Sequence, residues 1–421
     1  MKSHHSADNH PHPDAHAPEF STRRQFAASL LATSAFVPWA LGQAKTLADI
    51  AESFRQRSED AEKEGLAESF KGVTTQGSVV PDLFEIAPTG VSTEGVRNAA
   101  VRFMSSLSNL QLVRAMFPID DVQWRKWMNQ NFYTRQGVCF REMTDPQRKA
   151  ALGLIRASLS ARGFELMRNI MRLNETLAEL TNDHLVLGEW AYYITIMGKP
   201  SATDPWGWQF QGPHAIINYF ILADQVVMTP LFIGSEPARA NSGKYQGLEV
   251  LQKEQDDGLG LVRALPSPQQ QRAILSFSKT GGNNLTEAFK DNVVLDYAGL
   301  KAQELTTSSR QRLRELVQLY VSNMDDGHAR VKMNEVDRHM DDTWFAWIGG
   351  TEPDSVFYYR VQSPVILIEF DHQPPVGLEK FVADPDKPTR QHIHCVVRTP
   401  NGNDYGKDLL RQHYLSHPHA T

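Results

Sequence analysis

Two histidines separated by one residue, His392 and His394, are the side chains whose type and spacing most directly indicate chemistry. They lie in the run HIHCVVRT, which we expect to be a strand, so both imidazoles leave one face while Ile393 and Cys395 enter the core. Two neutral imidazoles at this spacing can share a divalent transition metal (Zn, Fe, Mn or Cu) if a further ligand comes from elsewhere. The alternative is that both histidines are polar contacts on a strand face.

The preceding run PVILIEFDH places Glu369 and Asp371 on one face of an otherwise apolar strand, with His372 directly after them. A carboxylate in such a run is costly to bury unless it is paired. Glu369 could ligate the metal, orient an imidazole or act as a catalytic general base. Alternatively, it forms an ion pair with Arg360 or Arg398 inside the sheet. We count His372 among the candidate metal ligands.

Further candidates come from an earlier turn and from the end of the histidine strand. His214 follows a Gly-Pro turn and is expected to supply another imidazole, although a lone strand histidine is more often structural. Arg398 ends the histidine strand, and Asn403 or Asp404 can cap the helix that follows. The arginine and the helix N terminus would favour an anionic group of a small-molecule substrate. Tyr405 would then be a proton donor, with simple packing as its default role.

The elements that position these residues change character along the chain. From Thr46 to about Leu180 the apolar residues recur at helical spacing. From about Glu189, aromatic and β-branched runs broken by Gly and Pro indicate strands. The sequence therefore predicts an α+β fold with a helical N-terminal half, followed by two antiparallel β units with intervening helices. The later helices are expected at 247–254, 268–276, 308–324 and 405–415.

The two strand groups, at about 189–237 and 343–404, are similar to each other in sequence. The segment QFQGPHAIINYF aligns with RVQSPVILIEF, which places Asn218 opposite Glu369, and VVMTP resembles VVRTP. We therefore predict an internal repeat about a pseudo-twofold axis, with the site at the seam between the two units. Chance similarity between short strands is the alternative.

The N-terminal sequence STRRQF, followed by the weakly apolar AASLLATSAFV, is typical of a twin-arginine export signal. This apolar run is shorter than the roughly 20 residues that cross a bilayer as a helix. We predict a signal peptide over 1–44, recognised by the twin-arginine export machinery, and a single mature domain over 45–421. That domain is expected to be periplasmic or secreted, without a stable membrane anchor. The alternative is that the two arginines merely cap an amphipathic helix.

The composition is that of a globular protein, with 41% hydrophobic and 22% charged residues among 421. Lys and Arg total 43 against 49 for Asp and Glu, without long runs of one sign, which argues against nucleic acid as a partner. The only two cysteines, Cys139 and Cys395, exclude a disulfide scaffold. They could pair, but Cys395 is expected to be a buried thiol.

The segments HIHCVVRTPNGNDYGKDLL, PVILIEFDHQ, FAWIGG and WGWQFQG resemble the bacterial family known as domain of unknown function thirty-five hundred. The resemblance covers nearly all of the predicted mature chain. The family usually reads Gly-His-His where this chain has Gly212, Pro213 and His214, so a ligand role in that turn rests on His214.

The resemblance implies no reaction, and function must come from the site itself. The residues favour a metal-dependent enzyme, of hydrolase or oxidoreductase type, with a histidine and carboxylate centre. The alternative is a non-catalytic protein that binds a small ligand or a metal.

Overall fold

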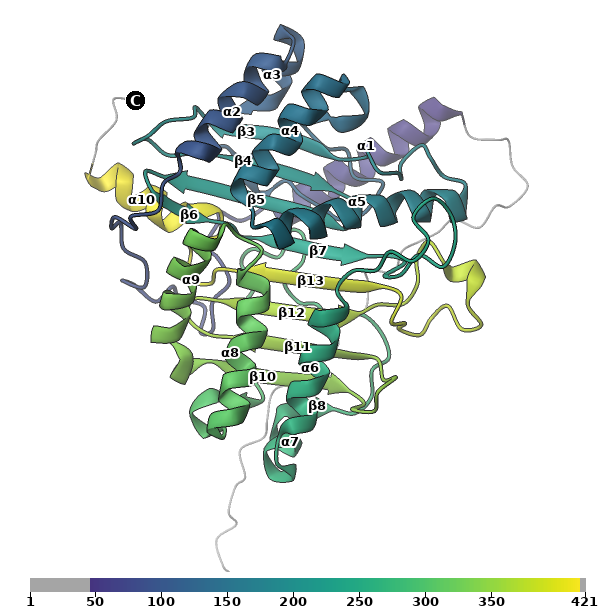
Figure 1. The fold of residues 1–421 in the computed structure, drawn as a ribbon, viewed down its shortest axis with the longest axis vertical. Helices are drawn as coiled ribbons and strands as arrows, with labels where there is room; N and C mark the ends of the chain where they lie inside the picture. The colour runs from purple at the N-terminus through teal and green to yellow at the C-terminus, as the bar shows by residue number, and fades with distance from the viewer. Residues whose placement is uncertain (1–45, 417–421) are drawn as a thin grey trace, which may run out of the picture. The chain divides into compact units, whose positions relative to one another are not determined.

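One mixed β-sheet organises the protein in the computed structural model, which describes residues 46–416 (Figure 1). The two strand groups of the sequence meet at its centre, and each central strand pairs antiparallel with its neighbours. In spatial order the central strands are β3 (Tyr193–Gly198), β4 (Trp206–Gly212), β5 (Ala215–Leu222), β7 (Leu231–Ser235), β13 (Ile393–Arg398), β12 (Leu367–His372), β11 (Phe357–Gln362) and β10 (Trp344–Gly349).

Short strands extend the sheet at its edges and beside β5. Two of them, β1 and β8, pair parallel with β3 and β10, which makes the sheet mixed. The short strands are β1 (Met116–Phe117), β2 (Val138–Cys139), β6 (Gln225–Val227), β8 (Ile274–Ser276) and β9 (Leu300–Lys301).

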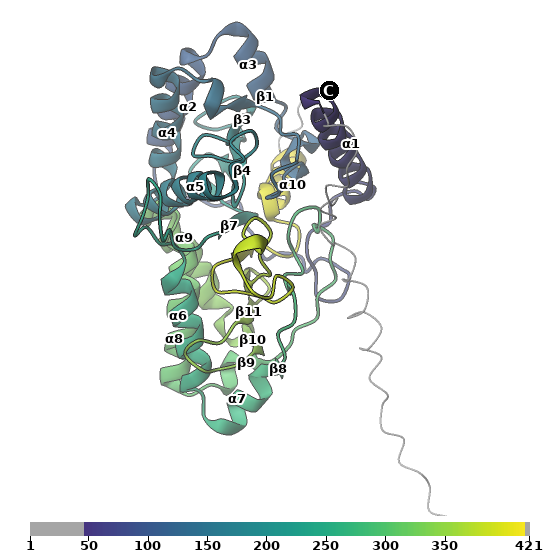
Figure 2. The same ribbon diagram turned by 90° about the vertical axis from the view of Figure 1, so that its right-hand side faces the viewer.

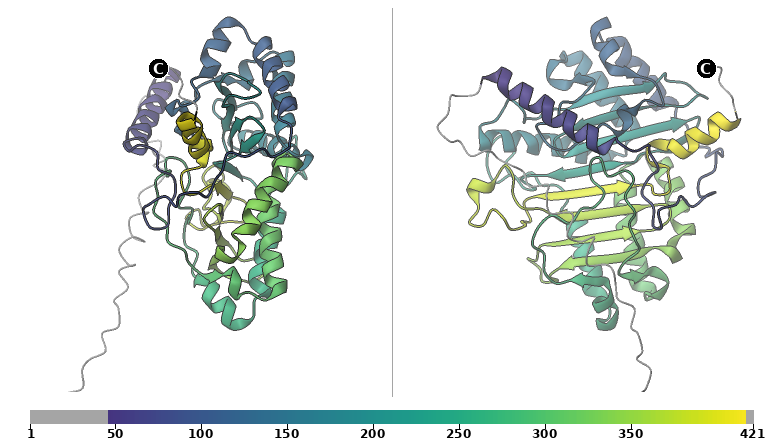
Figure 3. Two further views of the ribbon diagram at one scale, coloured as in Figure 1. Left: turned by 90° about the vertical axis from the view of Figure 1, so that its left-hand side faces the viewer. Right: turned by 180° about the vertical axis from the view of Figure 1, so that it is seen from behind.

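Helices cover one face of the sheet in two groups (Figures 1 and 2). Those over the β3–β7 half are α2 (Glu94–Ser106), α4 (Asp145–Ser158) and α5 (Ala161–Thr181), with α3 (Asn109–Ala115) beside them. Those over the β10–β13 half are α6 (Gln252–Ala264), α8 (Thr307–Val321) and α9 (Asp326–Arg338), with α7 (Ser267–Ala273) at the end. The opposite face carries α1 (Leu47–Gly65), α10 (Lys407–Ser416) and long loops (Figure 3).

Both faces of the central strands are therefore buried, which explains their nearly continuous apolar sequences. Ile217, Ile233 and Cys395 enter the larger core beneath the helices. Their neighbours on the other face, such as Phe232 and Val396, pack in a second core with Trp127 and Tyr405. The two cysteines are free.

The α+β prediction is confirmed, with helices first and two strand groups after them. The predicted helix at 247–254 was wrong in its bounds, since α6 runs from Gln252 to Ala264. Helix α9 was not predicted. It begins in the acidic segment NMDDGH, where Asp325 caps the helix by accepting a hydrogen bond from the Gly327 N–H at 3.0 Å.

The predicted repeat makes the strand pair β4–β5 equivalent to the pair β11–β12, and these two pairs have the same register. Gln209 pairs with Asn218, and Arg360 pairs with Glu369. The strand pairing does not support the equivalence of VVMTP with VVRTP. Val396 pairs with Glu369, so the equivalent Val226 would have to pair with Asn218, but it pairs with Ile221. The repeat itself stays a prediction.

The predicted signal peptide, 1–44, lies outside the described residues. Within 46–416, none of the helices is both long enough and apolar enough to cross a membrane.

Candidate metal centre

Three histidines predicted from the sequence meet beside the start of β13. The Nε2 atom of His392 lies 3.0 Å from that of His394 and 3.3 Å from that of His214. The ligand atoms of all three lie within 4.8 Å of one another, in a group that could hold a metal ion. His392 and His394 are buried, and His214 is partly buried. The side chains thus converge through the same ring nitrogen.

Local backbone structure brings the three imidazoles together. His394 pairs with Gly234 of β7, and the Gly234 N–H donates a hydrogen bond to the His214 carbonyl at 2.8 Å. His214 itself adopts a left-handed conformation, with φ of 62°, in the turn between β4 and β5. A Cβ at Gly234 would lie 2.6 Å from the Ile393 carbonyl oxygen and 3.1–3.2 Å from the Cδ2 atoms of His214 and His394. Glycine is therefore required where the two rings flank the strand.

The spacing of the nitrogens fits a tetrahedral ion. Zn–N bonds of about 2.0–2.1 Å at tetrahedral angles place two ligand nitrogens roughly 3.3 Å apart. The His392 Nε2 separations of 3.3 Å to His214 and 3.0 Å to His394 lie close to that value.

The outer nitrogens fix the tautomers of two of the rings. His392 Nδ1 lies 2.6 Å from the Pro374 carbonyl oxygen, which can only accept, so this nitrogen carries the proton. His394 Nδ1 lies 2.8 Å from Glu287 Oε1, and an ionised carboxylate imposes the same tautomer. Both Nε2 atoms then direct lone pairs at the same point. Two lone pairs at 3.0 Å repel each other unless a cation lies between them.

Burial keeps the imidazoles of His214 and His394 neutral. It lowers the pKa of His214 and of His394 well below the usual range, and the His392 ring beside them lowers each pKa further. Neutral imidazole is the form that binds a metal.

Glu287 contacts the histidine group, and the sequence did not reveal it. Its Oε1 also accepts a hydrogen bond from Asn284 Nδ2 at 2.8 Å, so the carboxylate is held between Asn284 and His394. Burial raises the pKa of Glu287, and the Asn284 hydrogen bond opposes that rise. A histidine ligand whose outer nitrogen contacts a carboxylate is the usual arrangement in metal sites. The two residues are 107 positions apart, and nothing in the sequence pattern links them.

Glu369, predicted as a general base or ligand, lies on the same sheet face but contacts a loop instead. It accepts hydrogen bonds from the Leu285 and Thr286 N–H groups at 2.9 Å, from the Thr286 hydroxyl, and from the Tyr358 hydroxyl at 2.7 Å. The alternative, an ion pair with Arg360 or Arg398, is not formed within the described residues. Glu369 thus anchors the loop that carries Glu287.

Arg398 and Tyr405 are also fully engaged within the protein rather than directed at the histidines. Arg398 is buried, pairs with Asp291 at 2.8 Å and Asp404 at 3.2 Å, and donates to the Thr286 and Glu287 carbonyls. The Tyr405 hydroxyl donates to Asp291 at 2.9 Å and accepts from Trp127 at 2.8 Å. Asp404 pairs with Arg398, while Asn403 accepts from the Leu409 N–H.

The structure does not bring His372 to the histidine group. It follows Asp371 by one residue, so its side chain leaves the opposite face of β12. Its Nδ1 accepts from the Phe357 N–H at 2.9 Å, and its Nε2 lies 3.0 Å from Gln255 Oε1. Both ring nitrogens are used, and the expectation that His372 is a ligand is corrected.

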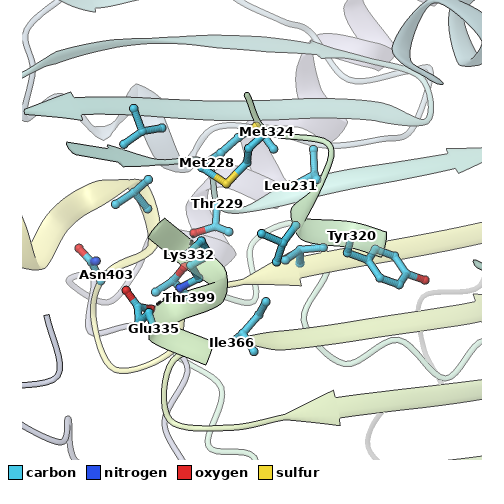
Figure 4. Close-up of a pocket in the computed structure, with 14 residues that line it drawn as sticks. Met228, Thr229, Leu231, Tyr320, Met324, Lys332, Glu335, Ile366, Thr399 and Asn403 are labelled. Atoms are coloured by element: carbon cyan, nitrogen blue, oxygen red, sulfur yellow. Dashed lines mark hydrogen bonds and ion pairs between the residues drawn. The ribbon is translucent and has the colours of Figure 1, made fainter. Parts of the chain in front are cut away.

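The seam between the two strand groups contains a small cavity (Figure 4). Its walls are mainly apolar, with Thr229 donating to Thr399 at 2.8 Å and an ion pair between Lys332 and Glu335. Val397 of β13 also lines the cavity, and its side chain leaves the strand on the side opposite His394. The cavity and the histidine group are therefore separate features on the two faces of the sheet.

A family model agrees with the resemblance of the strand motifs. The model described as "Protein of unknown function (DUF3500)" matches residues 89–407, which include all three histidines. No curated protein and no solved structure matches the chain. The chain belongs to the protein family of unknown function DUF3500.

Proposed function

We propose that this protein is an exported metal-dependent enzyme whose centre is His214, His392 and His394. The observation that carries the proposal is the convergence of three Nε2 atoms, two of them on rings whose outer nitrogens are fixed by Pro374 and Glu287. Three histidine ligands with oriented outer nitrogens are typical of catalytic zinc sites.

The ligand set favours catalysis over a purely structural role. Structural zinc sites are closed by four protein ligands, whereas catalytic sites leave one position for water or substrate. Among the described residues the group contains three histidines and no carboxylate. A bound metal would supply a Lewis acid that polarises a substrate oxygen or activates water. Hydrolysis and oxidation are both compatible with this set of ligands.

The chain's own residues would do the positioning. Pro374 and Glu287 hold the imidazoles in the binding tautomer, and Gly234 lets His214 and His394 approach each other. Glu369 and Arg398 keep the Glu287 loop in place through its backbone.

The metal content of the purified full-length chain, without a polyhistidine tag, tests the proposal. We expect close to one equivalent of Zn²⁺, Fe²⁺, Mn²⁺ or Cu²⁺ per chain after reconstitution and dialysis, and its loss in a His392→Ala, His394→Ala double variant. A His184→Ala variant is the control, since His184 is exposed. The metal centre would be refuted if the wild-type chain bound no more metal than the double variant. A binding protein would be favoured if the metal-loaded chain were inactive toward ester, phosphoester and oxidase substrate panels.

Export is the second part of the proposal, and the arginine pair in STRRQF supports it. We expect an Arg23→Lys, Arg24→Lys variant to remain in the cytoplasmic fraction of a bacterial host while the wild type reaches the periplasm. Equal distribution of the two forms would refute the twin-arginine route.

A further inference from the structure

A basic hollow lies on the helical face of the sheet, at the corner where α4 meets α5. Its volume is about 460 Å³, and its lining comes from a single stretch of chain. The histidine group is on the other face, so the hollow is a separate feature. Its lining residues are Arg156, Leu159, Ser160, Ala161, Phe164, Glu165, Arg168 and Arg172.

Each arginine of the hollow rests on an aromatic ring. The Arg156 guanidinium lies 4.3 Å from the Phe164 ring centroid, and that of Arg168 lies 4.8 Å from the Trp190 centroid. Arg172 lies 5.9 Å from the Tyr245 ring. Such contacts fix the plane of a guanidinium while leaving the N–H groups on its edges able to bind carboxylate or phosphate. In Arg168, Nη1 already donates to Met171 Sδ at 3.3 Å and Nη2 to Glu189 at 2.6 Å.

The positive charge of the hollow is only partly neutralised by the protein. Arg168 pairs with Glu189 at 2.6 Å, but Glu189 is shared with Lys244 at 3.2 Å. Arg172 donates to the neutral Asn169 side chain at 2.9 Å. Within residues 46–416, neither Arg156 nor Arg172 forms an ion pair. The lining also contains one acidic residue, Glu165, so three arginines stand against one carboxylate. In a chain with a net charge of −6, this is a local excess of positive charge.

The spacing of the side chains indicates the form of the ligand. Phe164, Arg168 and Arg172 follow one another at intervals of four residues, so they lie along one face of α5. A rise of 1.5 Å per residue separates the backbone positions of successive members by about 6 Å along the helix axis. Two anionic groups joined by a short linker match this distance.

We propose that the hollow binds an oligoanion that carries two or more phosphate or carboxylate groups about 6 Å apart. Arg168 and Arg172 each contact one anionic group, and Arg156 closes the site from α4. This site is independent of the metal centre, because none of its residues contacts the three histidines or the loops that hold them.

Isothermal titration calorimetry of the full chain at low ionic strength tests the proposal. Tripolyphosphate and tetragalacturonate are the two probes, and they distinguish a phosphate from a carboxylate ligand. Orthophosphate, which has a single phosphate group, is the comparison. We expect saturable binding of at least one oligoanion, at least about tenfold tighter than orthophosphate, because two guanidinium groups engage at once.

A pair of double variants separates the site from general charge. Arg156→Gln with Arg172→Gln is expected to weaken binding at least about tenfold. Arg263→Gln with Arg312→Gln changes the net charge equally at two exposed positions and is expected to leave the affinity within about twofold. Thermal unfolding confirms that both variants fold. Equal weakening by both variants, or the absence of wild-type binding to both oligoanions, would overturn the proposal.

Discussion

The contact between Glu287 and His394 offers the sharpest test of the metal centre, because it can be altered without touching a ligand. Glu287 Oε1 lies 2.8 Å from His394 Nδ1, and Asn284 holds the same oxygen at 2.8 Å. Glu287→Gln keeps the length of the side chain and its capacity to accept a hydrogen bond but removes the negative charge. Glu287→Ala removes the acceptor as well, so His394 loses its oriented tautomer.

Loss of such an outer partner typically weakens metal binding by about 10–100-fold, which corresponds to about 1.4–2.7 kcal/mol. We expect Glu287→Gln near the lower end of this range, because the amide oxygen can still accept from Nδ1. Glu287→Ala is expected near the upper end, since the ring is then free to turn and to exchange tautomers.

Competition against a chromogenic zinc chelator measures these differences as shifts in the dissociation constant. Glu352→Gln is a matched control, because Glu352 is exposed and its carboxylate forms no ion pair with any histidine within the described residues. Thermal unfolding of each apo-protein shows whether the fold is retained. If both Glu287 variants bind zinc as tightly as the wild type, then Glu287 does not orient His394 for metal binding, and the tautomer argument fails.

Two further predictions concern the strands beside the centre. Gly234→Ala places a Cβ 2.6 Å from the Ile393 carbonyl oxygen, so β7 and β13 must separate; we expect a stability loss of about 1–3 kcal/mol in urea unfolding, together with weaker zinc binding. Burial raises the pKa of Asp404 to about 6, against the opposing charge of Arg398, so the folded state holds this proton more tightly than the unfolded state does. The stability that this provides is complete below the unfolded pKa of about 3.9 and is lost as the pH rises through about 6. Relative to Asp404→Asn, the wild type should therefore lose on the order of 2 kcal/mol of unfolding free energy between pH 4 and pH 7, and a constant difference between the two proteins would contradict this.

The sequence could predict those features that depend on strand periodicity. The alternation of side chains places His392 and His394 on one face, and Glu369 shares the face of Asp371, because a period of two is set by the backbone alone. The same alternation puts His372 on the opposite face, so its assignment as a ligand went against the pattern that supported the others. His214 was predicted because it follows the turn of the first strand group, which the expected repeat places across the seam from the histidine strand.

The loop residues could not be predicted in the same way. Glu287 lies in a long segment without regular structure. Its position depends on hydrogen bonds that the backbone N–H groups of that loop donate to Asp371 and Glu369, and on one that Arg398 donates to a carbonyl of the loop. Nothing in the local sequence specifies which strand face a loop will cover. Pro374 is similar, since it contributes only a carbonyl oxygen, which every residue possesses.

Glu369 of β12 and Arg398 of β13 are buried charges, and their role differs from the catalytic role predicted from the sequence. Burying Glu369 and Arg398 is costly unless each polar group finds a partner, and N–H and C=O groups of one loop are among those partners. Glu369 as acceptor and Arg398 as donor thus hold the loop from two adjacent strands. Glu287, which follows Thr286 in this loop, contacts His394. The two residues expected to take part in chemistry instead position the carboxylate that contacts His394. Their substitution would therefore act on the proposed metal centre through Glu287.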